Sequence, residues 1–240
     1  MKAIDLSFSP ELRQLVSAER VVGRSGVPRS NNAVSTENNL IVLRNLMMEN
    51  EPERTMEVGL ACGGSAMVFA SAHRDLGRSP VAQHVAIDPY QSRERGYDSI
   101  GDDNLSRAGL REYVEIIEDY SSAALPRLVA DARKVQLAYI DGSHLFEDVF
   151  IDFYYVNHLL DEGGIVCFDD CAFPDVAKLI RFVQRNFKGH LDELDLAPFR
   201  ADQGKSLRYR AATILNRTQM RAFRKTGPTS RKFKAPFRNF

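Results

Sequence analysis

The fold is decided at residues 54–65, which read RTMEVGLACGGS. Residues 54–60 are a short apolar run typical of a buried strand, and the glycine turn at 61–65 leads into helical spacing over 65–76. The same unit recurs, with strands expected at 84–90, 113–119, 135–142 and 165–171, helices at 102–109, 121–132, 145–163 and 174–187, and two closing strands at 194–200 and 208–217. This alternation predicts an α/β fold: a doubly wound, mostly parallel seven-stranded sheet with helices on both faces.

Three regions are expected along the chain. Residues 1–34 form an N-terminal extension of helix and loop, with a short helix over 10–21. The α/β domain covers 35–216 and opens with a helix over 39–50, for which Thr36 is the expected N-cap. Residues 217–240 have little apolar periodicity and are expected to be a flexible extension.

Composition limits the class of protein. The chain has 240 residues, 44% hydrophobic and 27% charged, which suits one large domain with a sizeable core and excludes wholesale disorder. Its three cysteines cannot build a disulfide framework, so a reducing cytoplasm is the expected setting. No apolar stretch is long enough to span a membrane, and the N-terminus lacks the apolar core of a secretory signal.

The neutral net charge hides an asymmetry. Of the 32 basic residues, eleven follow Asp202, whereas none of the 32 acidic residues does. Residues 1–202 therefore carry a net charge of −11, and the rest of the chain is strongly basic. In that basic part, phenylalanines alternate with lysines and arginines, which favours either stacking on nucleic-acid bases, a solvated tail, or docking onto the acidic body of the same or a neighbouring subunit.

The strand ends carry the functional signal, because ligands of parallel α/β sheets bind outside the carboxyl ends of the strands. At the first of them, Gly59, Gly63 and Gly64 let the backbone pass close to a ligand, although a tight turn alone would also require small residues. Their spacing differs from the dinucleotide and P-loop fingerprints, which disfavours a pyrophosphate site. Asp88 ends the second strand and can accept both hydroxyls of a ribose, or else cap the turn before Pro89.

These residues carry a family resemblance. EVGLACGGSA at 57–66, with Asp88 at the next strand end, resembles the nucleoside-binding half of class I S-adenosylmethionine-dependent methyltransferases. The segment YIDGSH at 139–144, followed by EGGIV at 162–166 and by two aspartates at 169–170, is similar to the small-molecule O-methyltransferases related to catechol and caffeoyl-CoA enzymes. The resemblance covers about 34–216 and implies a Rossmann-like methyltransferase sheet.

The resemblance also implies roles for particular residues. The backbone at Gly59, Ala61 and Gly63 would approach the methionine part of S-adenosylmethionine, with Glu57, Ser65 and Asp141 nearby, Asp88 would hold the ribose, and Tyr120, Ser121 and Ser122 would border the adenine. In metal-dependent members, Asp141, Asp169 and Asp170 would hold a divalent cation. His144 stands where the catechol-type enzymes have a catalytic lysine.

The chemistry of these side chains supports a cation site independently. Asp141, Asp169 and Asp170 would repel one another in a partly dry site, and Mg²⁺ relieves such repulsion with oxygen ligands. The alternative is that the three aspartates cap the helices that follow them. His144 is mostly neutral near pH 7 and can accept a proton from the methyl acceptor, or else it is a histidine at a helix start without a chemical role.

The function expected from the sequence is therefore S-adenosylmethionine-dependent methyl transfer to a hydroxyl of a small molecule, with Asp141 and His144 as catalytic residues and Mg²⁺ as a further cofactor. An RNA or protein methyltransferase recruited by the basic C-terminal residues is the main alternative. A non-catalytic protein that binds the cofactor is the third. A homodimer is left open.

Overall fold

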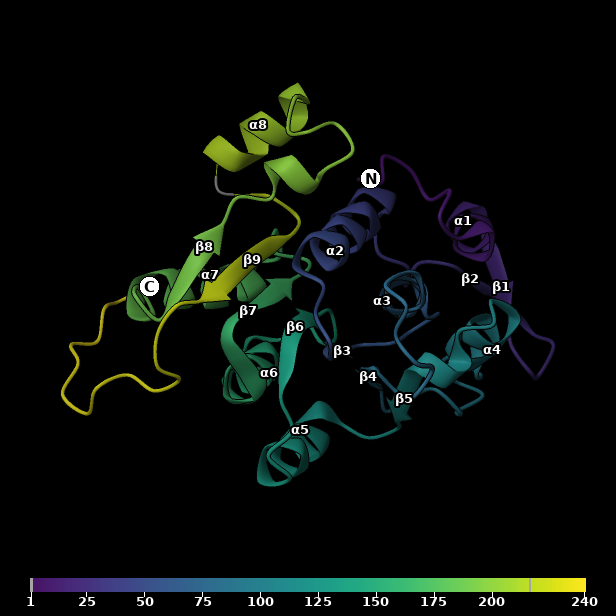
Figure 1. Cartoon of the computed structure of the whole chain (residues 1–240), viewed down its shortest axis with the longest axis horizontal. Helices are drawn as coiled ribbons and strands as arrows, with labels where there is room; N and C mark the ends of the chain where they lie inside the picture. Colours follow the sequence, from purple (N-terminus) through teal and green to yellow (C-terminus); the bar gives the residue numbers. More distant parts are fainter. Residues whose placement is uncertain (1, 216) are drawn as a thin grey trace.

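The computed structural model describes residues 2–215 and 217–240 and contains the expected α/β sheet (Figure 1). Its strands lie in the order β5-β4-β3-β6-β7-β9-β8. They are β3 (Thr55–Val58), β4 (His84–Ile87), β5 (Val114–Ile117), β6 (Val135–Ile140), β7 (Leu160–Phe168), β8 (Leu191–Leu194) and β9 (Arg221–Lys225). Strands β3 to β7 are parallel, and β9 pairs antiparallel with both β7 and β8. The prediction of a mostly parallel, seven-stranded sheet is confirmed.

Helices cover both faces of the sheet. One apolar cluster contains buried side chains of α1 (Pro10–Ser17), α2 (Glu37–Asn50), α3 (Gly64–Asp75) and α4 (Ile100–Arg107). The cluster on the other face contains those of α5 (Ser121–Ala130), α6 (Phe146–Leu159) and α7 (Pro174–Asn186). Two strands, β1 (Arg20–Val22) and β2 (Pro28–Ser30), form a separate hairpin, and α8 (Leu207–Ile214) lies beyond the sheet (Figure 1). Single 3₁₀ turns occupy Arg111–Tyr113 and Ala197–Phe199.

Local chemistry explains where the helices begin. The Thr36 side chain accepts a hydrogen bond from the backbone N–H of Asn39 and caps α2, as predicted. Pro174 is the first residue of α7, where a missing N–H costs nothing. The apolar positions of α7 then face the core.

The C-terminal part of the prediction was wrong in three respects. The segment 194–200, expected as a closing strand, contains only the last residue of β8 and then the 3₁₀ turn at Ala197–Phe199. The segment 208–217, expected as a closing strand, contributes instead to α8, whose cap is the Ser206 hydroxyl and none of whose side chains is buried; residue 216 lies outside the described residues. The closing strands are β8 and β9, and β9 lies inside the region that was expected to be a flexible extension. Its charged residues obscure the strand pattern. Lys225, for example, is buried because its ammonium donates to the carbonyls of Asn157 (2.8 Å) and Leu160 (2.7 Å).

Candidate active site

The carboxyl ends of the parallel strands border two adjoining cavities. The larger, about 500 Å³, extends over the ends of β4 and β6 toward the start of α5. The smaller, about 370 Å³, lies between the residues before α2 and the loops after β6 and β7. Five residues line both cavities: Gly59, Ala61, Tyr97, Asp141 and Gly142. The two cavities therefore share a wall, and an elongated ligand in one can present an atom to a ligand in the other.

Close packing within the protein requires glycine in the turn after β3. Gly59 has a φ of 95°, and a Cβ at this position would lie only 2.1 Å from the backbone carbonyl oxygen of Asp141. Gly63 has a φ of 84° and is the N-cap of α3, while Ala61 holds a left-handed φ of 47°. Because L-residues with a side chain are strained in this region, the turn geometry alone accounts for the glycines. Within this turn, Gly59 and Ala61 nevertheless line both cavities, and Ser65 lines the smaller one.

Asp88 lies at the floor of the larger cavity and organises the turn beside it. One of its carboxylate oxygens accepts the backbone N–H groups of Ala61 (2.8 Å) and Leu60 (3.2 Å), and the other accepts that of Tyr90 (2.8 Å). Only 3% of the residue is exposed. Asp88 thus lines the larger cavity and also fixes the backbone of the turn after β3.

The residues expected around the adenine also border the larger cavity. Ser121 and Ser122 are the first two residues of α5, so their side chains and the free N–H groups of the helix start lie at the cavity wall. Tyr120 is half exposed, and its ring meets that of Tyr90 edge to face. These positions suit a flat, polar ring system.

Glu57 does not border either cavity. Its side chain is fully buried, and the nearest charged partner is Nε2 of His84 at 3.5 Å. His84 in turn bonds the Thr55 hydroxyl through Nδ1 (2.8 Å), and the same hydroxyl meets Nε2 of His73 (2.9 Å). Burial lowers the pKa of His73 to about 3, so this histidine is neutral and has a structural role. Glu57 belongs to this buried polar network below the turn.

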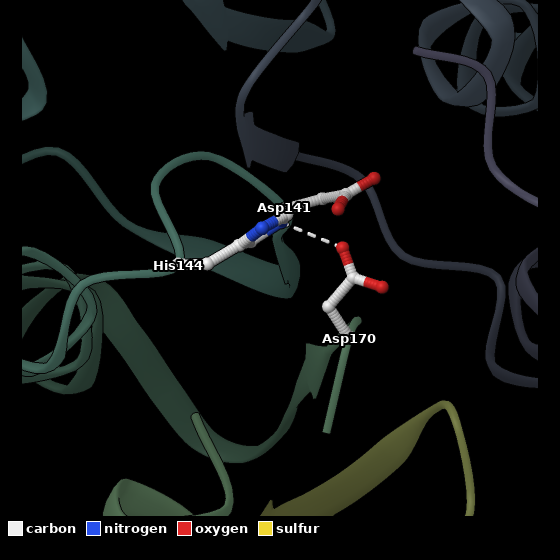
Figure 2. A group of neighbouring side chains, drawn as sticks. All are labelled: Asp141, His144 and Asp170. Atoms are coloured by element: carbon white, nitrogen blue, oxygen red, sulfur yellow. Dashed lines mark ion pairs between the residues drawn. The ribbon is translucent and has the colours of Figure 1, made fainter. Parts of the chain in front are cut away.

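A cluster of three side chains faces the smaller cavity (Figure 2). Asp141, His144 and Asp170 bring one ligand atom each to within 4.8 Å of one another. Nε2 of His144 lies 2.6 Å from Oδ2 of Asp170, and the imidazole stacks on the ring of Phe173 at 4.7 Å. Two contacts thus fix the orientation of the His144 ring, while the residue keeps an exposed edge. Asp170 has a left-handed φ of 52°, which turns it toward the histidine rather than along the strand.

Asp169 has a different environment from the one predicted. Its carboxylate accepts the hydroxyl of Tyr139 and, at 2.8 Å, the side-chain amide of Asn39, and its own neighbour Asp170 donates a backbone N–H to it. The sequence analysis groups Asp169 with Asp141 and Asp170, whereas the structure groups Asp141 and Asp170 with His144. Both residues follow the last residue of β7, and the left-handed backbone at Asp170 turns its side chain away from that of Asp169.

Burial and mutual repulsion perturb the acidic residues of this site. Burial, together with the nearby Asp169 carboxylate, holds the pKa of Asp141 well above its usual range. Burial also raises the pKa of Asp169, although hydrogen bonds from Tyr139 and Asn39 oppose this. Such shifts are frequent where carboxylates are gathered for proton transfer or for a cation.

Three residues that contact this cluster or line the cavities were not predicted from the sequence. The Ser35 hydroxyl donates to Asp141 (3.0 Å) and lies 3.1 Å from the Tyr139 hydroxyl, and the Gln219 amide donates to Asp170. Tyr97 lines both cavities, and burial with the nearby Asp88 charge raises its pKa to about 12. No motif marks these positions, because each precedes a helix or lies in a loop.

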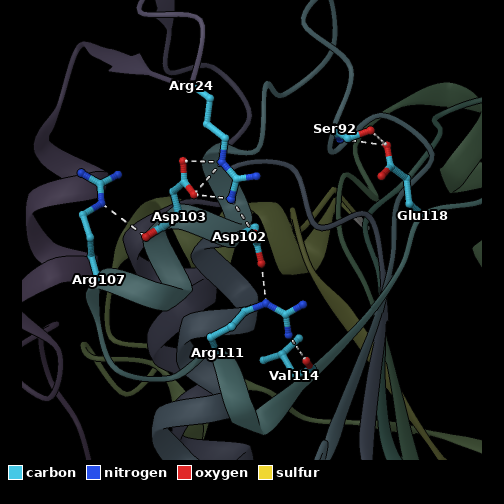
Figure 3. A network of polar contacts seen from close by, with 8 residues as sticks. All are labelled: Arg24, Ser92, Asp102, Asp103, Arg107, Arg111, Val114 and Glu118. Carbon is cyan, nitrogen blue, oxygen red and sulfur yellow. Dashed lines mark hydrogen bonds and ion pairs between the residues drawn. The ribbon is translucent and has the colours of Figure 1, made fainter.

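A network of ion pairs holds the loop that carries Tyr97 (Figure 3). Arg24, in the turn between β1 and β2, contacts both Asp103 (2.6 Å) and Asp102 (2.8 Å) at the start of α4. At the other end of the loop, Ser92 donates to Glu118 (2.6 Å) after β5. The N-terminal hairpin is therefore fastened to α4, which follows the loop that carries Tyr97.

Comparison with known proteins agrees with this geometry. Residues 56–171 match a family described as a methyltransferase domain. Similar folds include the SAH-bound methyltransferase PaMTH1 of Podospora anserina (TM-score 0.62, 15% identity, 91% of this chain and 88% of that chain). Others are an O-methyltransferase of Bacillus cereus in complex with SAH (0.59, 16%, 77% and 82%) and the O-methyltransferase TomG of Streptomyces achromogenes in complex with SAM (0.54, 16%, 91% and 90%). A search of curated proteins finds no match.

No helix among the described residues is both long enough and apolar enough to cross a membrane. The order of the sheet, the cleft at its carboxyl ends and the family match over 56–171 lead to one assignment. This chain has the fold of the class I S-adenosylmethionine-dependent methyltransferases, and its residues 56–171 match a methyltransferase-domain family.

Proposed function

We propose that the protein transfers the methyl group of S-adenosylmethionine to a hydroxyl of a small molecule. The observation that carries this proposal is the cluster of Asp141, His144 and Asp170 beside the wall shared by the two cavities. The larger cavity would take the adenosine part of the cofactor against Asp88 and the start of α5. The smaller cavity would take the acceptor. The sulfonium methyl then lies at the shared wall, where an acceptor oxygen can approach it in line.

His144 is the proposed proton acceptor. Its contact with Asp170 at 2.6 Å supports an imidazole whose Nε2–H is donated to the carboxylate, leaving Nδ1 free to take the proton of the hydroxyl. Stacking on Phe173 limits rotation of the ring. Asp141 lies on the other side of the cluster and, with Ser35, supplies polar contacts to the acceptor. This arrangement generates the nucleophilic oxygen with residues of the chain alone.

The same cluster fits a divalent cation. Two carboxylates and an imidazole within 4.8 Å of one another, next to a cavity with room for water, are a suitable donor set, and a cation would relieve the repulsion that raises the pKa of Asp141. Asp141, His144 and Asp170 would hold it, and the bound cation would supply positive charge that acidifies a hydroxyl. The nitrogen ligand differs from the all-oxygen set that the sequence favours for Mg²⁺.

Transfer of labelled methyl groups tests the proposal. The protein is incubated with methyl-labelled S-adenosylmethionine and a cell extract that has been separated into small-molecule, RNA and protein fractions. Label should enter the small-molecule fraction. Label confined to RNA or protein would instead support the alternative acceptors. Activity that persists in excess chelator would exclude a cation and leave His144 as the base.

Variants at His144 separate catalysis from folding. His144→Ala should lower kcat by roughly 10²–10⁴-fold while SAH binding is retained, since general bases contribute rate factors of this size. His158→Ala is the matched control, because this histidine lies at the end of α6 and lines neither cavity. Equal activities of the two variants would remove His144 from the mechanism.

A cytoplasmic setting belongs to the same proposal. Its support is that Cys62, Cys167 and Cys171 are all free and buried, which suits a compartment where thiols remain reduced.

A further inference from the structure

In the structure, the end of the basic C-terminal segment packs against a helix, α7, that is itself basic. Lys178, Arg181 and Arg185 lie at positions i, i+3 and i+7 of α7, and Lys188 continues the row just after its end. Asp175 is the only acidic residue in α7. The apolar positions of the helix face the core, so the row of cations faces outward and runs for about 15 Å at 1.5 Å per residue.

The C-terminal segment loops away from the sheet after β9 and returns to α7 at the end of the chain (Figure 1). The side chain of Asn186 exchanges two hydrogen bonds with the backbone of Arg238, both 2.9 Å, and Arg185 donates to the carbonyl of Asn239. The contact is apolar at its centre, where the ring of Phe240 meets Phe182 (5.0 Å). The end of the segment is therefore docked on α7, a helix of the α/β domain whose outward residues are themselves basic.

Both α7 and the C-terminal segment that returns to it are basic. We define the basic face as the eight residues Lys178, Arg181, Arg185, Lys188, Arg231, Lys232, Lys234 and Arg238. Six of them are exposed, and Arg181 and Arg231 are half-buried. Among the described residues, none of the eight is ion-paired with a carboxylate within 4.0 Å. Self-repulsion opposes this arrangement, and a bound polyanion would relieve it.

An aromatic side chain stands at the outer edge of the basic face. Phe233 is 100% exposed and lies between Lys232 and Lys234 in a turn closed by the N–H of Ala235 bonding the carbonyl of Lys232 (2.9 Å). Arg231 anchors the same turn through the carbonyl of Pro236 (2.8 Å). An exposed ring with a cation on each side can stack on a base while the cations contact the flanking phosphates.

We propose that the basic face binds the backbone of single-stranded nucleic acid, with Phe233 stacked on a base. The row on α7 supplies cations at intervals and has no exposed apolar row that could enter a membrane. None of the eight residues lines either cavity, so the proposal does not depend on the methyl acceptor. The packing of Phe240 against Phe146, two residues after His144, puts one end of the basic face near the edge of the cleft.

The test is fluorescence anisotropy of the full chain with a labelled oligouridylate of twelve nucleotides. Wild-type protein should bind it with an affinity that falls steeply between about 50 and 200 mM salt, because each phosphate contact on a single strand adds about 0.7 to the slope of log K against log salt. The double variant Lys232→Gln, Lys234→Gln should bind at least about tenfold more weakly at low salt, and its slope should be shallower by about 1.4. Phe233→Ala should weaken binding on the order of tenfold.

Two further variants decide whether the face acts as proposed. Lys178→Gln with Lys188→Gln should weaken binding like the pair in the turn. The matched control, Arg208→Gln with Arg210→Gln, removes two exposed cations from α8 and should bind the oligonucleotide as wild type does. The proposal is overturned if wild type does not bind, if the control loses as much affinity as the other pairs, or if the chain binds only phosphatidylserine vesicles in a parallel sedimentation assay.

Discussion

Replacing Asp88 with alanine tests the cofactor site at its most buried polar residue. The carboxylate is only 3% exposed and holds three backbone N–H groups, two of them in the turn after β3. The substitution therefore removes the expected partner of the ribose hydroxyls and also releases the turn that faces the cofactor. Asp88→Asn is the milder variant, because it keeps the size of the side chain but turns an N–H₂ toward one of the backbone donors.

The magnitude follows from the contacts. Hydrogen bonds to a charged group contribute about 1.5–3 kcal/mol each, so losing those to the ribose should weaken binding by about 2–3 kcal/mol, or roughly 30–150-fold. The N–H groups left without a partner should lower the free energy of unfolding as well, by about 1–3 kcal/mol. Calorimetric titration with SAH measures the first effect, and urea unfolding without ligand measures the second.

A control aspartate separates this site from general effects of charge. Asp119 also follows a strand, but its carboxylate pairs with Arg127 (2.5 Å) and lines neither cavity. Asp119→Ala should therefore bind SAH as wild type does. If Asp88→Ala binds SAH with wild-type affinity, Asp88 is not in the ribose site, and the larger cavity is not where the cofactor's ribose lies.

Three further substitutions have definite expected outcomes. Gly59→Ala should lower the melting temperature and weaken SAH binding, because its Cβ would lie 2.1 Å from a backbone oxygen at a φ of 95°; a thermal melt that matches wild type would contradict this. Arg24→Ala should leave the melting temperature nearly unchanged but speed SAH dissociation, because Asp102 and Asp103 lose the contact that fastens the hairpin. In stopped-flow measurements of SAH dissociation, added salt should raise the rate of wild type more than that of the variant. Burial raises the pKa of Asp152 from 3.8 to about 7. The free energy of unfolding of wild type should therefore fall as the pH rises between these two values, by up to roughly 1.4 kcal/mol per pH unit, whereas that of Asp152→Asn should not. In urea unfolding, the same difference in free energy of unfolding between the two proteins at pH 5 and at pH 8 would refute this.

Most of the sheet could be predicted because its parallel strands are buried on both faces. Such strands are short apolar runs that end abruptly in glycine or aspartate, as at Gly59 and Asp88, and the helices between them have clear amphipathic spacing. The antiparallel strand β9 lacks that pattern, since three of its five residues are charged. Lys225 is accommodated only because carbonyls from α6 and β7 surround its ammonium, and no local sequence signal reveals such partners.

The candidate site could also be predicted only in part from the sequence. Strand ends can be located from the sequence, and Asp88, Asp141 and His144 all lie at the cleft as expected. The direction in which each side chain points cannot be predicted from the sequence in the same way. Asp169 and Asp170 are adjacent in sequence, yet one bonds Tyr139 inside the protein and the other meets His144 at the cavity, because the backbone turns left-handed at Asp170.

The contact between Gly59 and Asp141 explains why the donor and acceptor cavities can act together. The backbone of Gly59 lies so close to the carbonyl of Asp141 that no side chain fits between them, and the N–H of Asp141 donates to the carbonyl of Val58 (2.9 Å). Backbone contacts thus hold together the turn that lines both cavities and the strand end that bears Asp141. We infer that a cofactor seated against this turn has its methyl group placed relative to Asp141 by backbone contacts, so acceptor loops can vary without disturbing the alignment needed for in-line transfer.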